Sequence, residues 1–79
     1  MKEVHLTQLN LNTTGVVRRI EGGHGVRQKL EALGIRPGKR VTVVSSHFWR
    51  GPVTVRMDKA QVAIGHGMAE RIVVEVESG

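Results

Sequence analysis

The residues best suited to metal chemistry in this sequence are its four histidines, and their spacing does not favour a shared site. They are His5, His24, His47 and His66, each in an expected loop or terminal segment. Two imidazoles aimed at one ion commonly come from spacings such as H-x-H or H-x-x-x-H, and no two of these residues are so spaced. The chain has no cysteine, which excludes thiolate ligands and disulfides. The histidines could meet only through folding, so we expect neither a metal nor another cofactor.

The sequence also lacks the groups that catalysis needs. It has no cysteine or tyrosine, and its serines are Ser45 and Ser46 at the end of an expected strand and Ser78 near the terminus. A nucleophile must stand beside a positioned base in a pocket. The glycine-rich stretch 22–25 could present N–H groups to a phosphate, but it lacks the G-x-x-x-x-G-K-[ST] pattern and a surrounding βαβ unit. We expect neither an enzyme nor a small-molecule substrate.

A pair of aromatic residues is the strongest candidate for a binding surface. Phe48 and Trp49 precede Arg50 in an expected loop, and they are the only Phe, Trp or Tyr residues in the chain. Aromatic residues and arginine are enriched at binding hot spots. The loop either presents an anchor to a partner or closes the end of the core with one ring. We favour the anchor, for which Trp49→Ala weakens the complex and leaves thermal stability nearly unchanged.

The excess positive charge is confined to one segment. The formal net charge is +5, and residues 18–40 alone hold seven basic and two acidic residues, so the rest of the chain sums to zero. Arg18, Arg19 and Arg27 belong to this segment, and we expect them to steer the protein toward an acidic surface. Solvated side chains on the rim of a small domain, or contacts to nucleic acid, would give the same pattern.

The elements that must position these residues are mostly strands. Thirteen valines and four isoleucines against five leucines favour β structure. Val26, Leu30 and Leu33 form one apolar stripe of a short helix, which Gly34 ends. Residues 36–39 have the Pro and Gly positions of a type II turn. The expected strands cover residues 16–21, 41–46, 53–57, 60–64 and 72–77.

Together these elements predict a mainly β fold, a small five-stranded barrel with one short α-helix. One or two helical turns are expected at residues 6–9 and 68–70. Arg18 shares a face with Val16 and Ile20 in strict alternation, and a β-bulge would correct this pattern. Closing the sheet protects its edges, which suits a small core. We expect residues 1–79 to form a single domain, and so small a core is compatible with a homodimer.

The order of these motifs resembles the FeoA family of bacterial ferrous iron uptake. The matching residues run through nearly the whole chain: Leu6-Thr7-Gln8-Leu9, Gly15, Leu30-Glu31-Ala32-Leu33-Gly34-Ile35-Arg36-Pro37-Gly38, Val41, Val43, Gly51-Pro52-Val53, Val55-Arg56, Ala69 and Ile72-Val73-Val74-Glu75. The combination L-x-x-L-G-I-x-P-G with a downstream G-P-V-x-V-R is the most specific part. The resemblance implies that the barrel is SH3-like.

The resemblance also implies a function. Members of this family are regarded as non-enzymatic cytoplasmic accessories that act by protein–protein contact on FeoB, a membrane iron transporter with a GTP-binding domain. We therefore expect a cytoplasmic regulatory protein, which the transporter recruits to the inner face of the membrane. The SH3-like module is also similar to the C-terminal domain of iron-dependent repressors. The alternative is accordingly a nucleic-acid-associated or transcription-regulator module that uses segment 18–40, although we do not expect nucleic acid to be the main partner.

Overall fold

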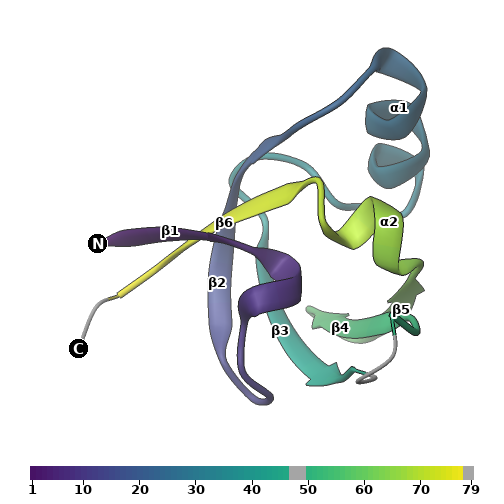
Figure 1. The fold of residues 1–79 in the computed structure, drawn as a ribbon. Coiled ribbons are helices and arrows are strands. Elements are labelled where there is room, and N and C mark those ends of the chain that lie inside the picture. Colours follow the sequence, from purple (N-terminus) through teal and green to yellow (C-terminus); the bar gives the residue numbers. More distant parts are fainter. Residues whose placement is uncertain (47–49, 78–79) are drawn as a thin grey trace.

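The strands of the protein form one antiparallel sheet. The computed structural model describes residues 1–46 and 50–77. In chain order its elements are β1 (Lys2–His5), the 3₁₀ turn η1 (Leu6–Gln8), β2 (Thr14–Ile20), α1 (His24–Ala32), β3 (Arg40–Ser45), β4 (Val53–Met57), β5 (Ala60–Ile64), α2 (His66–Ala69) and β6 (Ile72–Val76). The strand order is β1-β6-β2-β3-β4-β5 (Figure 1).

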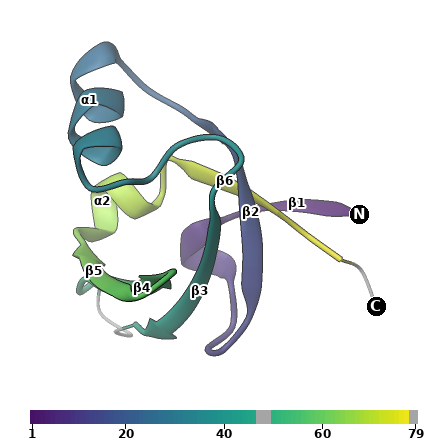
Figure 2. The ribbon, with the colours of Figure 1, turned by 180° about the vertical axis from the view of Figure 1, so that it is seen from behind.

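The sheet bends strongly, and the helices lie toward one end of it. In both views β2 runs vertically, whereas β4 and β5 run nearly horizontally (Figures 1 and 2). Both views place α1 at one end and the C-terminal end of β3 at the opposite end. The N-terminal strand β1 lies against β6 at the outer edge of the sheet.

The core is built by alternation along the strands. In β4, Val53, Val55 and Met57 are buried, whereas Thr54 and Arg56 lie on the outer face. This is the two-residue period of a strand with one face toward water. The buried cluster consists of Leu6, Val17, Ile20, Leu30, Ile35, Val41, Val43, Val53, Val55, Met57, Ile64, Ala69, Ile72 and Val74. Among the described residues, no polar or charged residue is buried.

The observed elements agree with the predicted mainly β class, and the number of strands differs. The described residues form six strands and not five, because Lys2–His5 pairs with β6 as an additional edge strand. Four residues with two charges at their start are too short a segment to predict a strand by alternation. The expected helix is α1, and the two expected helical turns are η1 and α2.

The predicted bulge in β2 is confirmed. The register of β2 against β6 shifts between Val17 and Arg19, which leaves Arg18 as the extra residue. The shift keeps Val17 and Ile20 in the core and leaves Arg18 and Arg19 exposed. A bulge therefore allows apolar residues three positions apart to face the same side.

Both faces of β6 are apolar around Val73. Strict alternation with the buried Ile72 and Val74 puts Val73 on the outer face with Glu75, yet Val73 is only 2% exposed. Strand β6 lies between β1 and β2, where Val73 is paired with His5 on one side and Arg19 on the other. Since directly paired residues share a face, these two long side chains flank Val73 and cover it.

Candidate functional site

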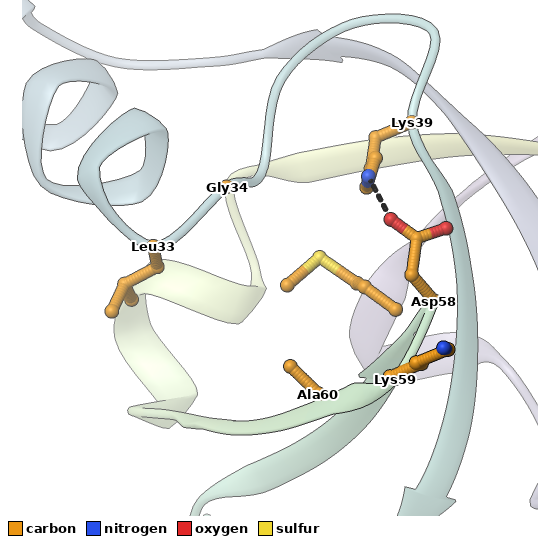
Figure 3. Close-up of a pocket in the computed structure, with 7 residues that line it drawn as sticks. Leu33, Gly34, Lys39, Asp58, Lys59 and Ala60 are labelled. Carbon is orange, nitrogen blue, oxygen red and sulfur yellow. Dashed lines mark hydrogen bonds and ion pairs between the residues drawn. The ribbon is translucent and has the colours of Figure 1, made fainter.

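An open pocket lies between the end of α1 and the hairpin that joins β4 to β5. Its volume is about 340 Å³. Leu33, Gly34, Met57 and Ala60 provide an apolar lining, and Figure 3 shows Leu33 after the end of α1 and Ala60 on the β4–β5 hairpin. Leu33 is 39% exposed, although most large apolar side chains of the chain are buried.

The C-terminus of α1 explains why Leu33 lies outside the core. The N–H of Ile35 donates to the carbonyl of Leu30 at 2.9 Å, and the N–H of Gly34 donates to the carbonyl of Glu31 at 2.9 Å. These two bonds define a Schellman motif, with Gly34 at a φ of +91° as its left-handed residue. The motif returns the chain into the core at Ile35. Leu33, the cap residue, remains at the surface.

The predicted type II turn then brings a cation to the rim of the pocket. The N–H of Lys39 donates to the carbonyl of Arg36 at 3.0 Å, and Gly38 has a φ of +93°. The turn is fixed to β2, because Gly38 donates to the carbonyl of Val17 at 2.7 Å and Val17 donates to that of Lys39 at 2.8 Å. Lys39 can therefore reach Asp58 in the β4–β5 hairpin, at 2.5 Å between Nζ and Oδ2 (Figure 3).

The rim of the pocket thus carries two cations and one anion. Asp58 and Lys59 are the two residues of the hairpin loop, and both line the pocket with Lys39. Only the first of them, Asp58, has a positive φ, of 50°. Such a rim, around an apolar floor, suits an apolar side chain of a partner that carries negative charge nearby.

The structure places two of the predicted steering arginines in local ion pairs. Arg19 donates to Glu3 at 2.8 Å and lies 3.6 Å from Glu21, and Arg18 lies 3.9 Å from Glu75. The hydrogen bond and charge of Glu3 raise the pKa of Arg19 above its ordinary value, so this guanidinium stays charged. Much of the field of these two arginines is balanced by their carboxylate neighbours.

Of the remaining predicted partner residues, the structure describes Arg27 and Arg50. Arg27 is exposed on α1, and no acidic group among the described residues lies within 4 Å of it. Arg50 is exposed, with a φ of 60°, and lies between β3 and β4 in the chain. Phe48 and Trp49 lie outside the described residues. Their predicted role as an anchor therefore remains a prediction.

The histidines for which the structure gives a position are dispersed. His5 contacts Glu21 at 3.1 Å, and His66 contacts Glu70, the residue that caps α2, at 3.3 Å. His24 begins α1 and is exposed. Within residues 1–46 and 50–77, no group of three His, Asp or Glu side chains is placed to hold a metal ion. His47 lies outside these ranges.

Sequence reasoning did not select the residues of this pocket. The spacing predicts Leu33 on the buried stripe of the helix and Lys39 in a turn, and Asp58 falls between two predicted strands. A usable signal is nevertheless present, because Leu33 directly precedes Gly34. The residue before the left-handed glycine is the helix cap, and the helical spacing that defines the stripe ends there.

The fold and the pocket together define a class, a small SH3-like β domain with an open apolar pocket at its surface. No helix in the part of the chain that the structure describes is long and apolar enough to cross a membrane. The sequence profile of the FeoA domain matches residues 4–76. The chain therefore belongs to the FeoA family, a family of ferrous iron transport proteins.

Individual relatives agree with this assignment. One relative is a protein of Methanocaldococcus jannaschii that is named as an Fe(2+) transport protein A. It is 35% identical to this chain over 60 residues, which are 76% of this chain and 71% of that protein. The crystal structure of an iron uptake regulatory protein (FeoA) is 36% identical, with a TM-score of 0.87, over 94% of this chain and 97% of that one. The expected SH3-like FeoA fold is thereby confirmed.

The fold also occurs inside a different kind of protein. A manganese-dependent transcriptional repressor is 25% identical to this chain, with a TM-score of 0.87. The match covers 95% of this chain but only 42% of the repressor. The similarity thus concerns one part of that protein, and a shared fold does not by itself assign a function.

Proposed function

We propose that this protein is a non-enzymatic cytoplasmic accessory of ferrous iron uptake that acts by contact with the cytoplasmic part of a FeoB-type GTP-binding iron transporter. Membership of the FeoA family carries the proposal, because the family match extends over residues 4–76. In this role the transporter recruits the protein to the inner face of the membrane. If the protein binds one state of the transporter more tightly than another, binding shifts the transporter's nucleotide or transport cycle toward that state.

The surface supports docking at the pocket between α1 and the β4–β5 hairpin. Leu33 offers exposed apolar area beside Ala60, and the ion pair of Lys39 and Asp58 borders it. An apolar anchor in a pocket with a charged rim is a common arrangement at protein interfaces. We place the main contact here, with the predicted Phe48–Trp49 loop as a further contact.

Co-purification tests the proposal. The tagged full chain is immobilised and exposed to the purified cytoplasmic part of the transporter encoded by the same organism, in its GTP-analogue and GDP states. We expect retention that differs between the two nucleotide states. If neither state is retained at micromolar concentrations, the proposal is wrong.

A second function is favoured by the repressor similarity alone. The outer face of the sheet carries Arg40 on β3 and Arg56 on β4, and no acidic side chain among the described residues lies within 4 Å of either. These arginines could contact phosphates. Binding to duplex DNA through phosphates weakens steeply with salt. A steep salt dependence would support this function, and weak binding that hardly changes with salt would exclude it.

A further inference from the structure

Strand β5 is an edge of the sheet, and its outer side carries backbone groups that face away from every other strand described. The two-residue loop Asp58–Lys59 makes Met57 and Ala60 a hydrogen-bonded pair, and bonded pairs then alternate along the ladder. Ala60, Val62 and Ile64 therefore bond to β4. The N–H and C=O groups of Gln61 and Ala63 point outward, and both residues are exposed.

This edge lacks the features that usually prevent pairing with another chain. Natural edge strands carry charges, proline or bulges. The other edge, β1, begins with Lys2 and Glu3. Strand β5 reads AQVAI, without a charge or a proline, and its register with β4 is continuous over all five residues. It therefore offers an open template for one more strand.

The edge begins at the pocket. Ala60 is the first residue of β5 and lies across the pocket from Leu33 (Figure 3). A strand added antiparallel to β5 places the side chain opposite Ala60 on the same face as Ala60, since paired residues share a face. That side chain is at the pocket. The two neighbouring side chains of the added strand lie on the outer face.

The charge around the edge selects the kind of strand. Arg56 is paired with Gln61 across β4 and β5, and Lys59 directly precedes the edge. Among the described residues, neither cation has an acidic group within 4 Å, and Asp58 is already bound to Lys39. An acidic side chain of the added strand, opposite Gln61, is separated from Arg56 by strand β5. The long side chain of Arg56 can reach across β5 to it. A second copy of this chain, with its net charge of +5, complements this surface less well.

We infer that β5 binds an extended acidic segment of the partner by strand addition, with an apolar side chain of that segment in the pocket at Ala60. This is a recognised mode of peptide binding, in which main-chain hydrogen bonds give affinity and alternate side chains give selectivity. The inference rests on the proposed function, because it assigns this segment to the cytoplasmic part of the transporter.

A model peptide tests the chemistry without the transporter. The probe is acetyl-TVEVEVT-amide, which alternates apolar and acidic residues, and it is titrated into the ¹⁵N-labelled full chain. We expect shift changes and slower hydrogen exchange at the amides of Gln61 and Ala63, and little change in exchange at Val62, whose N–H already bonds to β4. The matched peptide acetyl-TVKVKVT-amide binds more weakly. Equal binding of both peptides, or shifts that avoid β5, overturns the inference.

Methylated peptides give a control that leaves the protein unchanged. N-methyl groups on the two glutamates remove the N–H groups that would face β5, and N-methyl groups on the valines remove those that face away. We expect the first peptide to bind about tenfold more weakly than the parent peptide, or not at all. A tenfold loss of affinity corresponds to the net free energy of about one hydrogen bond. The second should bind nearly as well as the parent. Equal loss from both would rule out strand addition in this register.

The variant Ala63→Pro connects this test to the transporter. Proline removes only the outward N–H, which an edge strand tolerates, and Gln61→Thr keeps the backbone intact as a control.

The outcomes separate the inference from the proposed function. If the wild type and Gln61→Thr bind the cytoplasmic part of the transporter and Ala63→Pro binds about tenfold more weakly, the inference holds. If all three bind equally, it fails and the proposed function survives. If none binds, the proposed function fails and the peptide titration still decides for β5. A dimer of the isolated chain that Ala63→Pro abolishes would assign the edge to a second copy and overturn the inference.

Discussion

Leu33 is the residue on which the docking proposal depends most. It is 39% exposed at the cap of α1, and its neighbour Met57 is only 5% exposed, so truncation removes surface contact and leaves the core intact. We expect Leu33→Ala to change the free energy of unfolding by about 1 kcal/mol or less. The same change should weaken binding to the transporter by about tenfold, as for a hot-spot residue.

Leu11 provides the matched control for Leu33. It is the same residue type, is 55% exposed, and lies in the connection between η1 and β2 and not in the lining of the pocket. When both variants are titrated calorimetrically with the cytoplasmic part of the transporter, Leu11→Ala should leave affinity unchanged. Equal loss of affinity from both variants would show that the pocket is not the contact.

Asp58 balances the charge of Lys39 at the rim. The pair is partly exposed, with 32% of the Lys39 side chain and 78% of the Asp58 side chain accessible. Asp58→Asn should therefore change stability by less than about 1 kcal/mol, and asparagine tolerates the positive φ at this position. An acidic partner should bind the variant more tightly at low salt, and the gain should disappear at high salt. A weaker complex at low salt would contradict an acidic partner.

Gly34 is required by conformation and not by space. A Cβ at this position would be 3.8 Å from the Cε of Met57, an ordinary contact, whereas its φ is +91°. Gly34→Ala should cost about 1–2 kcal/mol in denaturant unfolding, the cost of a left-handed L-residue. Gly25, inside α1 with nothing within 4 Å, is the control. Gly25→Ala should be neutral or stabilising.

At the level of elements, α1 contributes one fully buried side chain to the core, and most of its other residues are exposed. Leu30 is 0% exposed and Lys29 beside it is exposed. Leu30→Ala should lower the free energy of unfolding by about 2–5 kcal/mol, and Lys29→Ala should change it little. Since a domain of this size has about 4–12 kcal/mol in total, the Leu30 variant will be marginal. A loss below about 1 kcal/mol would mean that α1 does not pack as described.

Elements whose limits depend on local chemistry were predictable from the sequence. The left-handed Gly34, the turn through Gly38 and the alternation of β4 all follow from residue type and spacing, and so does the bulge in β2. Features that depend on contacts between residues distant in the sequence were not predictable. Strand β1 exists because β6 offers it an edge, and Val73 is buried because His5 and Arg19 flank it. The pocket was missed for the same reason, because Leu33 and Ala60 meet only in the folded chain.

At the scale of the whole molecule, the two edges of the sheet have different properties. Near β1, Arg19 is paired with Glu3 and Arg18 with Glu75. At the other edge, β5 begins at the pocket, Lys59 directly precedes it, and Arg56 is paired with Gln61 across β4 and β5. The positive segment 18–40 that stands out in the sequence is therefore not the whole of the proposed binding surface, since Arg56 and Lys59 lie beyond it. We propose that this surface directs an acidic partner to the pocket and the β5 edge.

The most direct test of this account is an NMR titration of the ¹⁵N-labelled full chain with the unlabelled cytoplasmic part of the transporter. The account predicts saturable binding, with the largest shift changes at Leu33, Gly34 and Ala60 and little change at Leu11. Binding that instead perturbs β1 and the paired arginines of β2, or no binding in either nucleotide state, would contradict it.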